Sequence, residues 1–434
     1  MKTVIEPSVI DGIMKDLEIT DIKTASIRQV GAIVRAAEAA TGTEFIHFEM
    51  GVPGLPPSAV GVKAECEALQ RGVASVYPII DGIPEVKEQA SRFLKAFVDT
   101  DIKPSGCIPT VGSMQASFAS LMLASQLSSE KDTVLYIDPG FPVQKMQANV
   151  IGVKFASFDI ADYRGAKLEE KLESYFAQGN ICAVLYSSPN NPTWMCLNDT
   201  ELEIIGRLAT KYDVVVIEDL AYMTMDFRRD MSKPYEPPFQ LSVSKYTDNY
   251  VMLMSASKIF SYAGQRIAMA CISDKLYERQ YDRLKERYGI PRFGAAFAYV
   301  FLYTFSSGVS HSAQYAMAAM LKAACDGEYN FVGDVKEYAD RTKRIKDILE
   351  RTGFNVVYDK DDEEPVSDGF FFTMGYKDMD GATLLQELLY YGVSGIDLST
   401  TGSKRKGIRA CSSNIKPHHY AILEERLKLF NENH

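Results

Sequence analysis

Two buried strands that we predict in the middle of the chain are each followed by residues able to take part in chemistry. The first, an apolar run over 213–219, ends in Asp219, and Tyr222 follows shortly after it. An ionised carboxylate at the end of a buried strand is costly unless a cation pairs with it. Asp219 is therefore either the N-cap of a following helix, which is common, or the partner of a cation on a bound ligand.

The second strand, over 250–254, runs into Ser255 and then Lys258. A lysine just beyond a buried strand can act as a Schiff-base nucleophile once partial burial lowers its pKa, although most lysines lie in solvated loops. Arg266 opens the next apolar run, where a guanidinium either holds a phosphate bidentately or lies at the surface. The order of these residues is more informative than any one of them.

Two further segments place polar groups after predicted strands. Around 109–117 a strand, a glycine and a helix start follow one another, so the backbone N–H groups of Ser113 and Met114 would form an anion site. The glycine is also explained without an anion, because a tight turn between a strand and a helix requires it as well. Asn191 follows the apolar run over 181–186 and precedes a proline, a pair that is also a common turn former.

The elements that would position these residues alternate between strand and helix. Short apolar runs bounded by turn signals predict buried, mostly parallel strands, and the stretch over 113–126 has the spacing of a helix. This alternation predicts an α/β layer architecture, in which ligands bind at the carboxyl ends of the strands. The predicted strands are 133–137, 181–186, 213–219, 250–254 and 266–272.

The C-terminal third has a different pattern. A long amphipathic helix is predicted over 334–354, closed by Gly353, followed by a short strand over 368–374 and a helix over 383–392. We expect a large α/β domain and a smaller α+β domain with which the N-terminal segment packs. The predicted bounds are 1–60 for the N-terminal segment, 61–325 for the large domain and 326–434 for the small domain.

Composition excludes several classes of protein. The chain has 434 residues, of which 46% are hydrophobic and 24% charged, and its formal net charge is −10. These fractions are typical of globular proteins and exclude disordered or collagen-like chains. The negative charge disfavours nucleic acid as a partner. No apolar run reaches the ~18 residues that a membrane span needs, and no signal peptide is visible.

Cysteine and histidine usage narrows the chemistry further. The seven cysteines are scattered singly, which argues against a disulfide framework or a thiolate zinc site and predicts a reducing, cytoplasmic location. The sequence lacks HExxH, GxSxG, GxGxxG and P-loop motifs. Metal-dependent hydrolysis, Ser-His-Asp catalysis, dinucleotide binding and P-loop phosphoryl transfer are therefore disfavoured, and we predict no metal site.

Taken together, the motifs YPIIDG, NPT, DLAY and SASK, followed by Arg266, resemble those of the class I and II aminotransferases, fold type I enzymes that use pyridoxal 5′-phosphate (PLP). The motifs extend from Gly51 to Arg409, over nearly the whole chain. The resemblance implies a mostly parallel seven-stranded sheet in the large domain. It also implies an enzyme of amino-acid metabolism that moves an amino group from an L-amino acid to a 2-oxo acid through an aldimine at Lys258. A homodimer with shared active sites is implied too, with no nucleic-acid or membrane partner.

The resemblance also implies roles for individual residues. Lys258 corresponds to the lysine that binds the cofactor and moves the substrate's α-proton, and Asp219 to the carboxylate that keeps the pyridine nitrogen protonated. Tyr222 and Asn191 correspond to the residues that hydrogen-bond the phenolic oxygen. Phe141 matches the aromatic residue stacked on the ring, although it is also compatible with an ordinary core phenylalanine. The expected phosphate site comprises Ser255, Arg266, the backbone of Ser113 and Met114, and Tyr77 from a neighbouring subunit.

Other residues correspond to the substrate site. Arg409, in the motif GIRACSS, matches the arginine that binds the substrate's α-carboxylate, with Gly51 and Asn191 near the same group. Arg292 lies in the interval where dicarboxylate-specific members carry a second arginine from the partner subunit. An equally good interpretation is that Arg292 is a surface arginine beside a turn.

Three positions depart from the family's pattern and weaken any inference about the substrate. Trp194 stands where the family usually has glycine, Gln265 where tryptophan often precedes the arginine, and Met114 where some aspartate aminotransferases have a lysine. Two alternatives stay open: a β-lyase acting on C–S bonds or an amino-acid decarboxylase on the same fold, and a non-catalytic PLP-binding regulator. The sequence does not specify the donor, the acceptor, the pathway or any assembly beyond a dimer.

Overall fold

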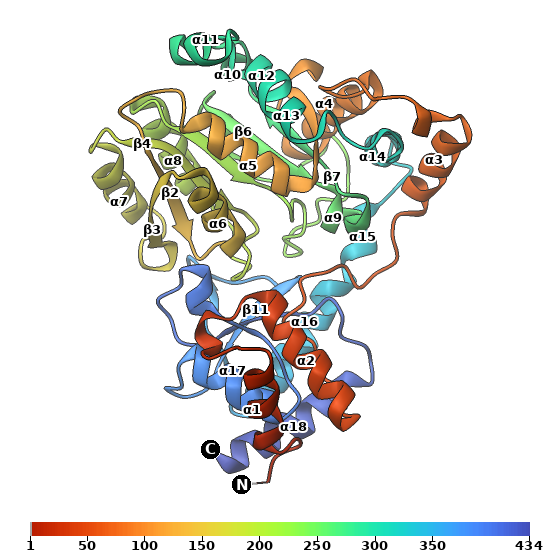
Figure 1. The fold of residues 1–434 in the computed structure, drawn as a ribbon, viewed down its shortest axis with the longest axis vertical. Coiled ribbons are helices and arrows are strands. Elements are labelled where there is room, and N and C mark those ends of the chain that lie inside the picture. Colours follow the sequence, from red (N-terminus) through yellow and green to blue (C-terminus); the bar gives the residue numbers. More distant parts are fainter. Residues whose placement is uncertain (1) are drawn as a thin grey trace. The chain divides into compact units, whose positions relative to one another are not determined.

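The computed structural model describes residues 2–434, which form two compact units (Figure 1). The boundaries between them lie at Gly54 and Val335. The boundaries predicted from the sequence were at residues 60 and 325. A short segment in the middle of the chain groups with the smaller unit. The large unit comprises Leu55–Pro189 and Cys196–Val335, and the small unit comprises the residues up to Gly54, Asn190–Met195 and Lys336–His434.

A seven-stranded sheet forms the centre of the large unit, in the order β1-β7-β6-β5-β4-β2-β3. Strand β7 is antiparallel to β1 and β6, and the other pairs are parallel. This confirms the predicted α/β architecture with a mostly parallel sheet. The strands are β1 Cys107–Val111, β2 Thr133–Asp138, β3 Lys154–Asp159, β4 Ile181–Ser187, β5 Val215–Asp219, β6 Tyr250–Ser255 and β7 Ile267–Ile272.

Strand β3 was not among the strands predicted from the sequence. Its first residues, beginning at Lys154, are exposed, because the strand lies at the edge of the sheet and pairs with β2 alone. An edge strand has no need of the continuous apolar run that marks a strand buried on both sides. The central strands, by contrast, are buried along their whole length or nearly so.

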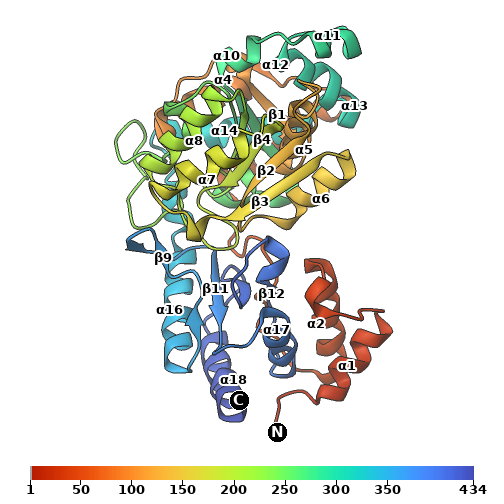
Figure 2. The same ribbon diagram turned by 90° about the vertical axis from the view of Figure 1, so that its left-hand side faces the viewer.

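Helices pack on this sheet and on one another (Figure 2). Helix α5 packs against β5, β6 and β7, while α14 packs against α3 and α4. Among residues 2–434, none of the helices combines the length and the apolar character that a bilayer crossing requires. The helices of the large unit are α3 Ala59–Gln70, α4 Pro84–Val98, α5 Gly112–Ala124, α6 Pro142–Ile151, α7 Lys167–Phe176, α8 Asp199–Lys211, α9 Ala256–Ile259, α10 Asp274–Glu278, α11 Asp282–Tyr288, α12 Phe293–Ala296, α13 Tyr303–Ser306, α14 His311–Cys325 and α15 Phe331–Val335.

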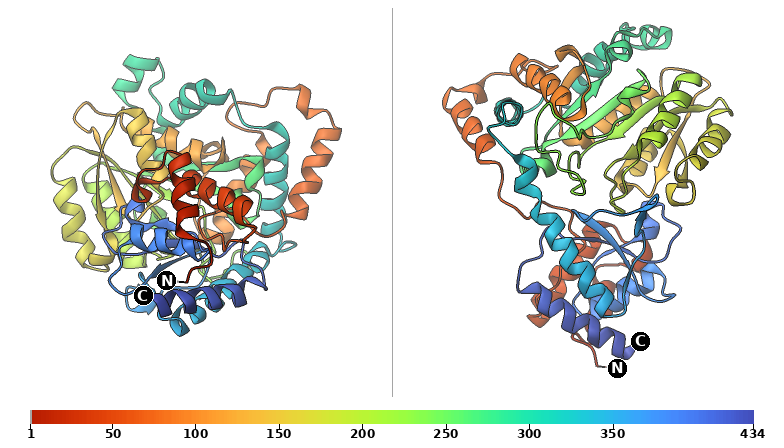
Figure 3. Two further views of the ribbon diagram at one scale, coloured as in Figure 1. Left: turned by 60° about the horizontal axis from the view of Figure 1, so that its bottom comes forward. Right: turned by 180° about the vertical axis from the view of Figure 1, so that it is seen from behind.

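The small unit contains a four-stranded antiparallel sheet in the order β12-β13-β11-β8. The single helix predicted over 334–354 is interrupted at Lys336, between α15 and α16, and Gly353 follows α16 with a left-handed φ of 81°. Helices α16 and α18 lie side by side when the molecule is seen from behind (Figure 3). The elements are α1 Pro7–Asp16, α2 Ile27–Thr41, α16 Glu337–Arg351, β8 Asn355–Val356, β9 Lys360–Asp361, β10 Glu364–Pro365, β11 Phe371–Gly375, α17 Gly381–Tyr390, β12 Ile396–Asp397, β13 Ile408–Cys411 and α18 His419–Asn433.

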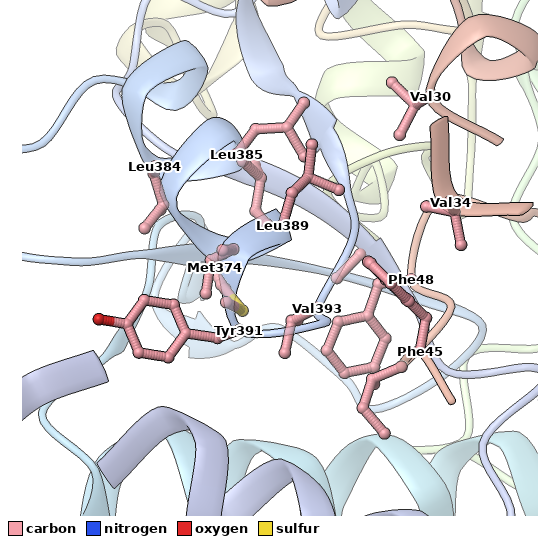
Figure 4. Close-up of a cluster of buried hydrophobic side chains, with 14 of the residues drawn as sticks. Val30, Val34, Phe45, Phe48, Met374, Leu384, Leu385, Leu389, Tyr391 and Val393 are labelled. Atoms are coloured by element: carbon pink, nitrogen blue, oxygen red, sulfur yellow. The ribbon is translucent and has the colours of Figure 1, made fainter. Parts of the chain in front are cut away.

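The N-terminal segment packs on the C-terminal part of the small unit. Phe45 and Phe48 join a buried cluster with Leu389 and Val393 (Figure 4). The backbone N–H of Ile46 donates to the carbonyl of Gly392 at 2.9 Å. Burial of this apolar surface is what ties two segments at opposite ends of the sequence together.

Candidate active site

Asp219 lies at the carboxyl end of β5, in the interior of the sheet between β4 and β6. The residues after it form a turn, so the reading as a helix N-cap is wrong. One carboxylate oxygen accepts the N–H of Ala221 at 3.1 Å and the other accepts the side-chain amide of Gln144 at 2.8 Å. Burial raises the pKa of Asp219 to about 6, against the opposing effect of these hydrogen bonds. A nearby ligand cation would stabilise the ionised form.

Gln144 is a site residue that sequence analysis missed. It lies in the first turn of α6, and its own carbonyl accepts the hydroxyl of Tyr136 at 2.9 Å. A glutamine has no distinctive motif, and its only signal in the sequence is its place just after Phe141 and the end of β2. The structure shows that it orients the buried carboxylate of Asp219.

Lys258 follows the neighbouring strand. β6 ends at Ser255 and leads directly into α9, which contains Lys258. The side chain of Ser255 accepts the N–H of Ser257 at 3.2 Å, which starts this turn. Asp219 pairs in register with Leu253, so β5 and β6 end beside each other. The structure thus places the half-buried lysine and the buried carboxylate at the same edge of the sheet.

Arg266 lies against the start of α5. Its backbone is left-handed, with a φ of 53°, and its carbonyl accepts the N–H of Gly112 at 2.9 Å. Its guanidinium lies over Gly112, where any Cβ would collide with it, and donates to the carbonyl of Ala263 at 2.9 Å. Gly112 itself has a φ of 66°. Glycine is therefore favoured here by the left-handed backbone conformation, and it leaves room for the guanidinium beside it.

The first turn of α5 contains Ser113 and Met114. Backbone N–H groups in a first helical turn lack intrahelical acceptors and attract anions. Gln147 holds this turn in place, because its side-chain amide donates to the carbonyl of Met114 and accepts the hydroxyl of Ser117, both at 2.8 Å. With Arg266 at the same helix end, the geometry suits a phosphate group.

Three more predicted cofactor residues belong to the large unit. Tyr222 is buried in the turn after β5, and Phe141 is the half-buried residue that precedes α6. Both therefore follow carboxyl ends of sheet strands. Tyr77, in the loop between α3 and α4, has 88% of its surface exposed.

Arg409 lies in the small unit, on β13, and is buried. One of its terminal nitrogens donates to the backbone carbonyl of Glu49. The guanidinium carbon lies 5.0 Å from the ring centre of Phe371. A Cβ on Gly51 would lie 3.1 Å from the same ring and 3.9 Å from Arg409 Nη1. The loop at Gly51 thus comes close to the arginine.

Glu49 was also missed by sequence analysis. Its buried side chain contacts Nδ1 of His47 at 3.0 Å and accepts the hydroxyl of Ser394. Burial opposes ionisation of Glu49, but the hydrogen bonds from His47 and Ser394 outweigh it and lower its pKa. The hydrogen bond to Glu49 correspondingly raises the pKa of His47. This pair immobilises the residue whose carbonyl holds Arg409.

Asn191 is buried in the segment Asn190–Met195, which belongs to the small unit. The side chain of Asn190 accepts the N–H and the hydroxyl of Thr193 at 3.1 and 2.8 Å, and its carbonyl accepts the N–H of Trp194 at 2.9 Å. This network orients the whole turn.

Arg292 precedes α12 on the surface of the large unit. It pairs with Glu278 at 3.1 Å, and both side chains are exposed. An exposed pair of this kind contributes little to stability. The suggested role of Arg292 in a partner's site stays a prediction.

Glu44, His418 and His419 form a cluster in the small unit. Both histidine Nε2 atoms lie near Glu44 Oε1, at 3.2 and 3.0 Å. The backbone N–H of Lys416 donates to Nδ1 of His419 at 3.2 Å. Neutral His419 therefore carries its proton on Nε2 and donates it to Glu44. This hydrogen bonding opposes metal ligation through that nitrogen.

Known proteins resemble this chain in sequence. The profile of the family described as aminotransferase class I and II matches residues 43–411. A glutamate–pyruvate aminotransferase of Escherichia coli is 29% identical over 55% of this chain, and the match spans only 56% of that enzyme. A probable aspartate aminotransferase of Methanocaldococcus jannaschii is 22% identical over 76% of this chain and 87% of its own length.

Solved structures show the same fold. An aspartate aminotransferase of Thermus thermophilus, in a single-mutant form, aligns over 94% of this chain and 97% of its own with a TM-score of 0.76 at 20% identity. An alanine aminotransferase of Pyrococcus furiosus aligns over the same shares with a TM-score of 0.75 at 19% identity. At these identities the likeness concerns the fold.

The chain belongs to the class I and II aminotransferases, the PLP-dependent transferases of this fold. The predicted family, fold, enzyme class and cofactor are therefore confirmed, and the relatives give no support to a lyase or a decarboxylase. The residues of the large unit fit the cofactor. A buried carboxylate suits a ring cation, a lysine suits an aldehyde, and a glycine cradle with an arginine suits a phosphate.

Proposed function

We propose that Lys258 is the residue that binds PLP and carries the proton during transfer of an amino group from an L-amino acid to a 2-oxo acid. The observation that carries this proposal is Asp219, a buried carboxylate with a raised pKa at the end of β5, beside the strand that leads to Lys258. When bound, PLP supplies the electron sink of the reaction. The Lys258 amine would be the base that takes the proton from the substrate's α-carbon.

Other residues of the large unit hold the cofactor. The Asp219 carboxylate keeps a proton on the pyridine nitrogen. A buried negative charge is stabilised by a positive charge beside it, so the carboxylate favours the protonated ring. Tyr222 donates to the phenolic oxygen, and Phe141 stacks on the ring. The phosphate is bound by Ser255, Arg266 and the N–H groups of Ser113 and Met114, and by Tyr77 of a second copy.

Residues of the small unit hold the substrate. Arg409 binds the α-carboxylate bidentately, since a guanidinium matches a carboxylate in geometry and charge. Gly51 leaves room beside it, and Asn191 orients both substrate and cofactor through its amide. Arg292 of a second copy binds the distal carboxylate of acidic substrates. L-Aspartate, L-alanine and L-glutamate are the donors to try first, because relatives are named for aspartate and for glutamate–pyruvate transfer.

A homodimer in the cytoplasm is part of the proposal. Tyr77 and the exposed side chains of Leu69 and Val76 line a hollow of about 710 Å³, together with Ser306 and His311. Exposed apolar side chains grouped in this way favour burial against another surface. All seven cysteines are free thiols, which suits a reducing compartment.

The visible absorption spectrum of the protein with PLP tests this function. We expect a pH-sensitive band that a competent L-amino acid bleaches and that 2-oxoglutarate restores, which also ranks the donors. Release of pyruvate from a cysteine-like substrate without any oxo acid would identify a lyase instead. A protein that shows no band with PLP would contradict the assignment of the cofactor site.

A further inference from the structure

Trp194 occupies a position where its backbone conformation and its neighbours are unusually constrained. Its φ of 64° lies in the left-handed region, which residues other than glycine rarely adopt. Its side chain is completely buried, and the turn is held by the hydrogen bonds of Asn190 to Thr193 and Trp194. Strained conformations of this kind persist where the surrounding structure enforces them and are frequent at functional sites.

The indole packs against β11 and the residues just before it. Its ring centre lies 6.4 Å from that of Phe371, with the planes at 61°. A Cβ on Gly369 would overlap the indole ring, so only glycine leaves room for it there. Trp194 therefore fills space beside the Phe371 ring.

The face of the same Phe371 ring supports Arg409. In the pairing of β11 with β13, Phe371 lies opposite Cys411 and Arg409 opposite Thr373. Phe371 and Arg409 are thus diagonal neighbours on one face of the sheet, within reach of an aromatic side chain. The guanidinium lies 5.0 Å from the ring centre, a distance at which a cation and a ring attract each other.

We propose that Trp194 and Phe371 are positioning residues that fix the Arg409 guanidinium in the orientation that receives a substrate carboxylate. This inference rests on the proposed role of Arg409. Phe371 restricts the tilt of the guanidinium plane, Trp194 restricts the Phe371 ring, and the Glu49 carbonyl holds one guanidinium nitrogen. The arginine side chain then loses less conformational entropy when a carboxylate binds. This increases the affinity for amino donors and for oxo-acid acceptors alike.

Trp194 is also a built-in reporter, because it is the only tryptophan of the chain. Neutralising the charge of Arg409 with a carboxylate changes the electric field across the Phe371 ring and the indole next to it. We therefore expect the emission of the holoenzyme to shift when an unreactive carboxylate, maleate or 3-phenylpropionate, is added.

The test compares Phe371→Leu, Phe371→Tyr and a matched control, Phe354→Leu. Phe354 is equally buried in the small unit, but it packs on Tyr376 and Phe430. We expect Phe371→Leu to raise the half-saturation concentration of the fluorescence change, and KM for both substrates, by roughly tenfold. Turnover per PLP-loaded site should stay within about twofold of wild type. Phe371→Tyr, which keeps the ring, should restore both values.

Each outcome separates this inference from the proposed function. Equal half-saturation values for Phe371→Leu and Phe354→Leu, or an emission that no carboxylate changes, would overturn the positioning role. A lower turnover per PLP-loaded site with unchanged KM would also overturn it, because that pattern shows an effect on the catalytic step and none on carboxylate binding. The fluorescence titration uses unreactive ligands, so its result does not depend on turnover of an amino donor. A failure to turn over any amino donor would contradict the proposed function and not the positioning role.

Discussion

The side-chain amide of Gln144 donates a hydrogen bond of 2.8 Å to the buried carboxylate of Asp219. The two residues come from different elements, the first turn of α6 and the end of β5. The hydrogen bond favours the ionised carboxylate, whereas burial favours the neutral acid. Gln144 thus helps to decide how readily the Asp219 carboxyl ionises.

Replacing Gln144 by leucine tests this relationship. Hydrogen bonds to charged groups contribute about 1.5–3 kcal/mol, which corresponds to about one to two pKa units. We expect Gln144→Leu to raise the pKa of Asp219 further and to lower kcat at neutral pH about tenfold or more, measured at saturating PLP. Gln314→Leu is the control, because Gln314 is also buried but hydrogen-bonds the backbone of Ile83 and Val309. Equal losses of kcat in the two variants would refute a specific role for Gln144.

Removing the amine of Lys258 should separate cofactor binding from catalysis. We expect Lys258→Ala to bind PLP without the absorption band of the lysine-linked cofactor and to lose about 10²- to 10⁴-fold in turnover, the usual contribution of proton transfer by a side chain. The visible spectrum and single-turnover rates measure both effects. Lys245→Ala, which alters an exposed lysine, should behave as wild type. An unchanged spectrum in Lys258→Ala would refute the assignment.

Glu218 makes stability depend on pH. It is fully buried and accepts hydrogen bonds from Tyr186, Ser242 and the N–H of Val243. Burial raises its pKa to about 7, against the effect of these hydrogen bonds. Between pH 4.5 and 7 the folded state therefore binds more protons than the unfolded chain, so the free energy of unfolding decreases as pH rises through this window.

The variant Glu218→Gln keeps the shape and removes the titration. We compare the free energy of unfolding of the wild type with that of this variant. The wild type should lose roughly 2–4 kcal/mol relative to the variant between pH 4.5 and pH 8. Denaturant unfolding of the cofactor-free protein at the two pH values measures the difference. Asp219 keeps its own pKa of about 6 in both proteins and cancels in the comparison. A pH-independent difference would show that Glu218 does not titrate in this range.

Arg292 should affect only acidic substrates. If it binds the distal carboxylate from a second copy, Arg292→Ala should weaken kcat/KM for L-aspartate and L-glutamate roughly 10- to 100-fold, the value of a charge-assisted hydrogen bond. L-Alanine should react as before. Arg283→Ala, another exposed arginine, serves as the control. Equal losses for all donors would leave Arg292 with a surface role.

The sequence by itself determined the central strands and the residues that follow them. Strands buried on both faces must be apolar throughout, so β2, β4, β5, β6 and β7 were visible as short runs. Their ends were visible too, because Asp219 and Lys258 interrupt apolar surroundings where a charge is costly. Strand β3 was not visible, since an edge strand is free to carry exposed polar residues.

Tertiary structure decided the contacts that orient these groups. Gln144, Glu49 and Phe371 are ordinary residues locally, and their roles arise from hydrogen bonds and ring contacts between segments distant in sequence. The pairing of the N-terminal segment with the end of the chain arises in the same way. Local periodicity reflects which side of an element is buried, whereas the identity of a partner depends on packing that only the folded chain brings about.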